Sequence, residues 1–333
     1  MQLSVLDQSI VRAGSDARTA LAETLQLARF VEQLGYARIW VSEHHDSPVI
    51  AGSSPEVLLA AIGAATHSIR IGSGGVMLPH YSAYKVAENF AVLSNLYPGR
   101  VDLGVGRAPG ADMNAAIALA TDGRPKFERF PQLVKTLTEA LWSPDFKPRV
   151  GPTPYGSIPV WVLGTSADSA LLAAELGLPY SVALFINPQF DPRIVELYRQ
   201  RFRPGVLQRE PRVMIAMNVF CADTTQQAEA MTRAADLTYI RFLTQRGAVQ
   251  VCSPEEAEQH RFSAEEHAFV QGVSAARAVG TAETVRERVE EFARRYRADE
   301  VMAVCNTFHF RDRLHSFELL ARAFGLEPGT VAS

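Results

Sequence analysis

Residues 38–45, Arg38-Ile39-Trp40-Val41-Ser42-Glu43-His44-His45, carry the pattern that decides the fold. The first five residues favour a strand, and three ionisable side chains follow them directly. The next segment, Pro55–Thr66, starts with proline behind Ser54, a favourable pair for the start of a helix. A second strand is predicted at Ile69–Gly72. The chain therefore shows a strand, a helix and another strand in succession.

The same alternation continues along the sequence. Eight strands are predicted, at Leu3–Asp7, Arg38–Ser42, Ile69–Gly72, Arg100–Gly106, Ile158–Leu163, Tyr180–Leu184, Val213–Cys221 and Glu300–Cys305. Helices are predicted between the strands and after the last one, among others at Thr19–Leu34, Ala83–Leu96, Ser166–Leu176, Pro188–Phe202 and Arg311–Phe324. Eight such units favour an α/β fold, a closed parallel (β/α)8 TIM barrel. A doubly wound sheet would need two cores and a linker, and no linker is visible, so residues 1–333 are expected to form one barrel domain.

Two segments interrupt the alternation and are expected to be insertions, at about residues 108–156 and 243–278. The first contains a predicted helix near Phe130–Trp142 and a stretch rich in proline and glycine. The second mixes polar and apolar residues without clear strand character. Long insertions in a barrel are commonly lids or oligomer contacts. The second is a candidate lid, with Arg261, Phe262 and His267 as possible contacts.

Composition excludes several classes of protein. The 333 residues are 47% hydrophobic and 21% charged, with a net charge of -3, which is ordinary for a globular protein. No broad basic field is present, so nucleic acid is a poor candidate partner. No apolar run reaches the length of a membrane helix. The three cysteines form no CxxC pair, which disfavours a disulfide framework and predicts a reducing, cytoplasmic location.

Glu43 and His44 are the candidate catalytic residues. They follow the second strand, and the carboxyl ends of barrel strands are where active sites gather. A carboxylate and an imidazole there suit acid–base chemistry near neutral pH. The alternative is a polar cluster at the end of the strand that only forms hydrogen bonds with the backbone of the loop. A metal site is disfavoured, because His44 and His45 point opposite ways in extended backbone and no third ligand has a recognisable spacing.

Two further segments are candidates for binding an anion or a ligand. Gly164-Thr165-Ser166 and Ser169 lie where a strand meets a helix, so hydroxyls, free N–H groups and the helix dipole converge there. A plain N-cap is the alternative. Arg107, at the end of the fourth strand, is a candidate phosphate ligand or a surface ion pair. Gly72–Pro79 contains glycines that permit close approach to the backbone, or form a simple bulge.

Taken together, the segments resemble the bacterial-luciferase-like flavin-dependent monooxygenase family. The segments that carry the resemblance, in order along the chain, are Leu3–Asp7, Val41–His45, Gly72–Pro79, Val86–Glu88, Leu96–Arg100, Gly104–Gly110, Leu163–Pro179 and Val279–Val285. The resemblance implies a luciferase-like barrel with FMN at its carboxyl end and His44 near the reactive edge of the ring. It implies a cis peptide at Gly74-Gly75 beneath the ring and a phosphate site at Arg107, Ser166 and Ser169. Thr165 stands where luciferases have a glutamate. Glu88 matches a family position on the helix after the third strand, and it is expected to belong to the cofactor site in a supporting position.

The family pattern is broken at Gly106, where light-emitting members carry a reactive cysteine. Its absence is expected to leave room beside the flavin. The resemblance implies a two-component monooxygenase, in which a separate flavin reductase supplies reduced FMN and O2 oxygenates an apolar carbonyl or aromatic substrate. Relatives pair through helices near Pro55–Leu96, so a homodimer is expected. The alternatives are a deazaflavin-dependent oxidoreductase and a non-catalytic flavin-binding homologue.

Overall fold

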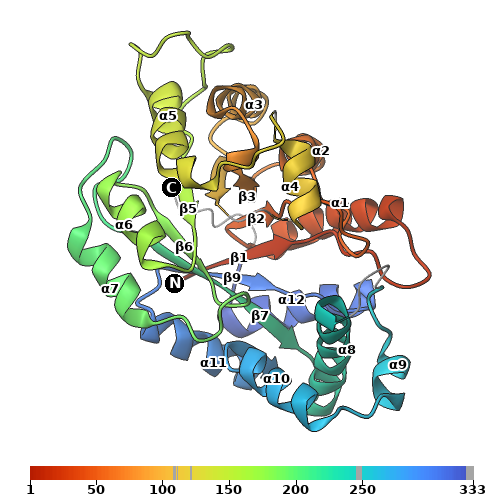
Figure 1. Cartoon of the computed structure of the whole chain (residues 1–333). Helices are drawn as coiled ribbons and strands as arrows, with labels where there is room; N and C mark the ends of the chain where they lie inside the picture. Colours follow the sequence, from red (N-terminus) through yellow and green to blue (C-terminus); the bar gives the residue numbers. More distant parts are fainter. Residues whose placement is uncertain (108–109, 111, 121, 245–249, 328–333) are drawn as a thin grey trace.

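The computed structural model describes residues 1–107, 110, 112–120, 122–244 and 250–327 (Figure 1). Its central sheet is parallel throughout the described residues. The strands are β1 (Gln2–Asp7), β2 (Arg38–Val41), β3 (Arg70–Met77), β4 (Val101–Gly106), β5 (Val160–Leu163), β6 (Tyr180–Ala183), β7 (Val213–Cys221), β8 (Arg277–Gly280) and β9 (Glu300–Val304).

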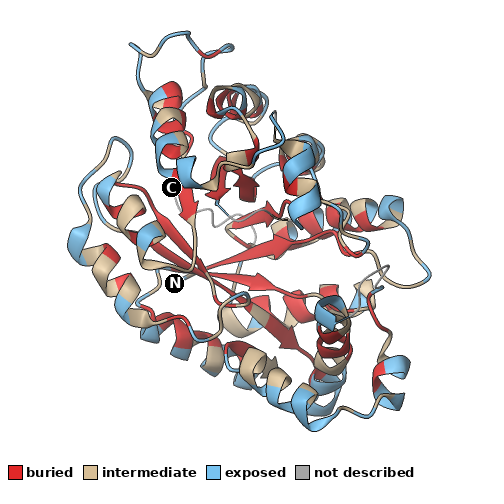
Figure 2. Cartoon of the chain, viewed as in Figure 1, coloured by how far each residue is buried: buried red, intermediate tan, exposed pale blue. Residues whose placement is uncertain are grey.

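Eight of these strands close into the predicted barrel. Their order is β6-β5-β4-β3-β2-β1-β9-β7, and a pairing between β6 and β7 completes the ring. Figure 2 shows the strands buried at the centre and the helices exposed on their outward faces. The eight-stranded parallel barrel predicted from the alternation is therefore confirmed.

The ninth strand, β8, corrects the expectation that residues 243–278 lack a strand. The first half of β7, Met214–Asn218, pairs with β9, and the second half, Asn218–Cys221, pairs with β8. A strand as long as β7 would otherwise leave unpaired backbone groups beyond the end of β9, and β8 satisfies them. This four-residue strand is set by its neighbour and has no periodic pattern of its own to predict it.

The helices surround the barrel (Figure 1). They are α1 (Ala17–Gln33), α2 (Pro55–Ala65), α3 (Ala83–Leu96), α4 (Met113–Leu119), α5 (Phe130–Trp142), α6 (Ala167–Glu175), α7 (Pro192–Arg201), α8 (Thr225–Thr244), α9 (Pro254–Gln259), α10 (Ala264–Ser274), α11 (Ala282–Arg295) and α12 (Phe310–Phe324), with short 3-10 turns η1 (Leu78–His80) and η2 (Phe127–Arg129). No helix among the described residues is both long and apolar enough to cross a membrane.

Local chemistry explains several helix ends. Asp16 caps α1 by accepting from the N–H of Thr19. Gly35 follows α1 with φ +84°, and a Cβ there would lie 2.4 Å from the Glu327 carbonyl oxygen, so glycine is required. Ser54 differs from the expectation: it precedes α2, but its side chain makes no capping bond.

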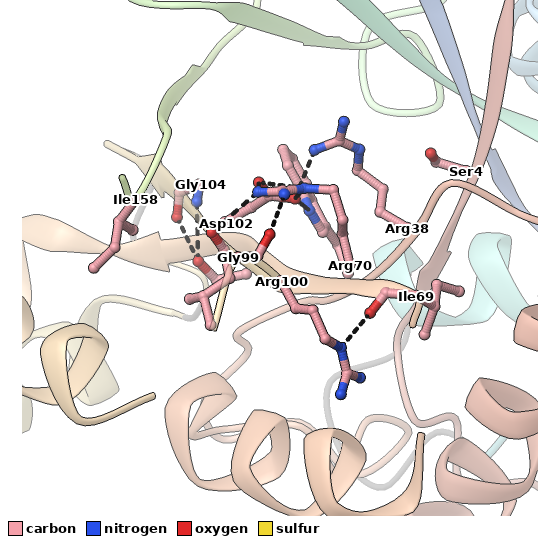
Figure 3. A network of polar contacts seen from close by, with 12 residues as sticks. Ser4, Arg38, Ile69, Arg70, Gly99, Arg100, Asp102, Gly104 and Ile158 are labelled. Atoms are coloured by element: carbon pink, nitrogen blue, oxygen red, sulfur yellow. Dashed lines mark hydrogen bonds and ion pairs between the residues drawn. The ribbon is translucent and has the colours of Figure 1, made fainter. Parts of the chain in front are cut away.

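Buried ion pairs lie inside the barrel, toward the amino ends of its strands (Figure 3). Arg38 Nη1 lies 2.6 Å from Asp102 Oδ2, and Arg38 Nε lies 2.7 Å from Glu300 Oε1. Both carboxylates are fully buried. Trp40 donates from its indole N–H to Asp102. Buried charges are tolerated only when paired in this way. The pairs therefore hold the indole ring of Trp40, which lines the cavity at the carboxyl ends of the strands.

Candidate active site

A cavity of about 740 Å³ opens at the carboxyl ends of the strands, and each of the eight barrel strands contributes to its wall. Nearly all of the site residues predicted from the sequence line it: Glu43, His44, Gly74, Gly75, Arg107, Gly164, Thr165, Ser166 and Ser169. Most of the remaining wall is apolar, including Leu6, Trp40, Met77, Phe127, Phe130, Phe185 and Met302. The fold thus brings together loops that are up to 126 residues apart in the chain, from Glu43 to Ser169.

Glu88 is the predicted site residue that the structure places elsewhere. It lies on α3, outside the cavity wall, and its carboxylate is 3.2 Å from the ammonium group of Lys85. One turn of a helix separates the two residues, so the pair is an ordinary contact along the helix surface. This position does not support a role in binding a cofactor.

His44 faces the cavity from the end of β2. Its Nδ1 lies 3.2 Å from Ser42 Oγ, and its Nε2 has no partner among the described residues. Burial disfavours the imidazolium and lowers the pKa of His44 below its ordinary value of 6.5, although the nearby Glu43 carboxylate opposes the shift. A neutral imidazole at pH 7, held through Nδ1, leaves Nε2 for proton exchange in the cavity.

Glu43 does not assist His44, contrary to the expectation. Its Oε1 lies 2.8 Å from His45 Nε2 and accepts from the Tyr81 hydroxyl at 2.9 Å. Its Oε2 accepts from the backbone N–H of Met77 at 3.1 Å. The carboxylate is almost completely buried, so these three protein donors take the place of water around its oxygens. Glu43 therefore joins the β2 loop to the end of β3 and orients the wall of the cavity.

The peptide bond between Gly74 and Gly75 is cis, as the resemblance implies. Neither position has room for a side chain. A Cβ on Gly74 would lie 2.7 Å from Leu6 Cδ1, and one on Gly75 would lie 2.8 Å from the Gly104 carbonyl oxygen. The two glycines therefore form a bare stretch of backbone in the cavity wall, against which a flat ring can lie.

Gly106 does not leave the empty space that was expected. Met77 and Gly106 are directly paired between β3 and β4. A Cβ on Gly106 would lie 2.8 Å from Met77 Cε, and one on Gly110 would lie 2.9 Å from Met77 Cγ. The thioether of Met77 thus fills the room that the absence of a side chain at residue 106 creates.

The start of α6 has the donor groups expected of an anion site. Ser166 and Ser169 make a reciprocal capping box, so the capping role considered for Ser166 is present. Within the described residues, the backbone N–H groups of Ala167 and Asp168 have no acceptor. Tyr180 donates its hydroxyl to the carbonyl of Gly164, which braces the turn. Burial raises the pKa of Tyr180 to about 12, so the hydroxyl keeps its proton.

The donor set of this turn suits a phosphate, and the bare glycine pair suits an aromatic ring system. Free N–H groups at the start of a helix, two hydroxyls and the exposed guanidinium of Arg107 are the groups that bind phosphate. The residues present therefore fit FMN. Among the described residues, no group of three or more His, Cys, Asp or Glu side chains is placed to hold a metal ion.

Sequence reasoning missed Met77, Tyr81 and Tyr180. Each lies within a predicted strand or loop, and nothing in its spacing distinguishes it from a core residue. None of the described residues in 243–278, the candidate lid, lines the cavity, and residues 245–249 of that segment lie outside the described residues. Phe262 packs instead beside α8 and α9, with the guanidinium of Arg233 4.7 Å from its ring centre.

Comparisons with known proteins find relatives that match nearly the whole chain. The chain is 46% identical over 330 residues to the uncharacterized protein YwcH of Bacillus subtilis (strain 168), covering 97% of this chain and 99% of that one. It is 38% identical over 319 residues to a luciferase-like monooxygenase of Escherichia coli (strain K12), covering 95% of each.

Solved structures show the same fold. The structure of apo-MsnO8 matches with a TM-score of 0.92 at 37% identity, over 98% of this chain and 99% of that one. The FMN complex of the oxygenating constituent of 3,6-diketocamphane monooxygenase from Pseudomonas putida matches with a TM-score of 0.72 at 20% identity, over 98% of each chain. Residues 1–299 match the family described as luciferase-like monooxygenase, and with its barrel and its relatives the chain belongs to that family.

Proposed function

We propose that this protein is the oxygenating component of a two-component monooxygenase. A separate flavin reductase supplies reduced FMN, and O2 is used to oxygenate an apolar carbonyl or aromatic substrate. The observation that carries the proposal is one cavity that joins a neutral histidine, a bare glycine pair and an anion site at a helix start. Family membership supports the oxygenation, and the FMN-bound neighbour supports the choice of cofactor.

Named residues would hold the cofactor. Arg107, Thr165, Ser166 and Ser169, with the free N–H groups at the start of α6, would bind the phosphate, while Gly74-Gly75 would lie against the ring. Bound in its reduced form, FMN supplies the two electrons with which O2 becomes able to transfer an oxygen atom to a substrate.

The chain supplies proton control and exclusion of water. His44 Nε2 is the site that would give or take the proton, while Ser42 holds the ring through Nδ1. Phe127, Phe130 and Phe185 present apolar surface that keeps water away and accepts an apolar substrate. The same apolar wall makes a highly charged substrate a poor fit.

A reductase-dependence experiment tests the proposal. With FMN and NADH but no reductase, the purified protein should not oxidise NADH at a useful rate. Adding any flavin reductase should start oxygen consumption, and a suitable substrate should convert part of that oxygen into product. Rapid NADH oxidation by the protein alone would contradict the two-component scheme.

The protein is also proposed to be a homodimer that pairs through α2 and α3. Val57 on α2 is exposed, as are Val92 and Leu96 on α3. Asn89 on α3 donates to Glu56 on α2, so the two helices that carry these exposed side chains lie side by side. Exposed apolar side chains that gather on adjacent helices mark a protein interface more often than scattered ones.

A further inference from the structure

Met77 places a thioether at the wall of the cavity. Its sulfur lies 3.4 Å and 3.6 Å from the positions that Cβ atoms would occupy on Gly106 and Gly110, and both glycines line the cavity with it. No side chain of those two residues can cover the sulfur. The residue is 9% exposed in a structure whose other core methionines are almost fully buried.

The contacts of the backbone fix this position. The N–H of Met77 donates to Glu43, and Glu43 is held in turn by Tyr81 and His45. His44, the proposed proton-transfer residue, lines the same cavity. The backbone of Met77 is therefore held at the wall of the same cavity that His44 lines.

Other methionines of the chain provide natural comparisons. Met302 also lines the cavity, but it is 1% exposed and packs in a cluster with Trp40 and Trp161. Met214 and Met217 are completely buried in the core. Met113, on α4, is 58% exposed and does not line the cavity. Reagents that arrive from bulk solvent therefore meet Met113 first, whereas a reagent formed in the cavity meets Met77 first.

We propose that Met77 is a site of oxidative self-modification, converted to its sulfoxide by hydrogen peroxide released in the cavity when no substrate is bound. The inference rests on the proposed function, because peroxide forms when O2 takes two electrons and two protons and no substrate accepts an oxygen atom. The Met77 sulfur then attacks one peroxide oxygen and the O–O bond breaks. The other oxygen leaves as water with both hydrogens, so the sulfur is oxidised by two electrons and the peroxide is reduced.

The geometry gives the modification a consequence. On the side of Gly106 and Gly110 the thioether already occupies the space that side chains there would take, which leaves little room for the added oxygen. It must project into the cavity, where it places a polar group on an apolar wall beside His44. Oxidation of Met77 thus weakens the binding of apolar substrates, and methionine sulfoxide reductases reverse the change.

The test compares two sources of peroxide. In the first arm, the protein, FMN, a flavin reductase, NADH and O2 react in the dark without substrate, and catalase removes peroxide from the bulk. In the second arm, hydrogen peroxide is added to the protein without FMN or catalase. Sulfoxide at Met77, Met113 and Met302 is then measured by peptide mass spectrometry, and FMN binding is measured separately by equilibrium dialysis.

In the first arm, sulfoxide at Met77 should exceed that at Met113 by at least about tenfold, and in the second arm Met113 should lead, because oxidation follows access to the oxidant. Met302 should stay reduced in both arms.

If FMN binds but Met77 is oxidised less than Met113 in the first arm, only this inference is overturned. If Met77 leads equally in both arms, the oxidant need not arise in the cavity, and the inference is also overturned. Failure to bind FMN overturns the proposed function and this inference with it.

Discussion

His44 and His45 are adjacent in the chain but have different partners. His44 lines the cavity, whereas His45 pairs with the buried Glu43. His44→Ala should keep FMN binding and lower turnover by roughly 10²–10⁴-fold, the usual effect of removing a group that transfers a proton. His45→Ala should instead lower the thermal midpoint, because Glu43 loses one of its donors. Product formed per oxygen consumed and the thermal midpoint separate the two variants, and full rate and coupling in His44→Ala would contradict the assignment.

The lowered pKa of His44 also predicts a pH dependence of stability. The unfolded chain binds a proton near the ordinary pKa of 6.5, whereas the folded chain binds it only at lower pH. Stability therefore falls as the pH falls through this window, because the unfolded state then holds more protons. His44→Gln, which cannot be protonated, should lose less stability than the parent between about pH 7 and about pH 5. Urea unfolding at several pH values measures the difference; identical slopes for the two proteins would refute it.

At the scale of the element, α6 and α10 start with the same kind of capping box but should differ in function. Ser166→Ala should lose about 0.5–2 kcal/mol of stability with its cap. It should also weaken FMN binding by about tenfold or more, because a hydroxyl that contacts a dianion is lost, while riboflavin binding should not change.

Ser263→Ala is the matched control for that prediction, because it removes the capping box of α10, which lies outside the cavity wall. It should lower stability by a similar amount and leave FMN affinity unchanged. Calorimetric titration with FMN and riboflavin distinguishes the two serines. Equal FMN affinity in Ser166→Ala and the parent would exclude Ser166 as a ligand.

At the scale of the whole molecule, the exposed surface of α2 and α3 predicts the oligomeric state. Val57→Glu should convert a dimer into monomers, since a charge placed in an apolar interface is desolvated without a partner. Val206→Glu is a suitable control, because Val206 is similarly exposed, 67% against 69%, but lies between α7 and β7. Sedimentation velocity gives the masses. A parent protein that sediments as a monomer would contradict the proposed dimer.

The barrel itself could be read from the sequence because its signals are local. Val213–Cys221, Ala83–Leu96 and Phe130–Trp142 were each predicted with the bounds that the structure shows. Strand preference, helical spacing and capping residues act within a few positions of one another. The direction of the strands then brings their carboxyl ends together, which is why all the predicted site residues except Glu88 line one cavity.

Other features arise only from packing between distant segments. The sequence places Glu43 beside His44, but the side chain turns to Tyr81 and Met77, 38 and 34 residues further along. Strand β8 forms because β7 extends beyond the end of β9 and leaves backbone groups to be paired. Glu88 lies near the glycine segment in the sequence but outside the cavity wall in the structure. The space at Gly106 is filled by Met77 because β3 and β4 pair at that register.

The sequence by itself thus determined the barrel, the loops that carry the site and most of the side chains that line it. The tertiary structure alone decided which of these side chains contact one another and how the remaining space is filled. The physical reason is that backbone conformation follows local preferences, whereas the direction of a buried polar or flexible side chain follows the donors, acceptors and volumes that other strands and loops bring to it. Glu43 and Met77 are the residues at which this difference is clearest.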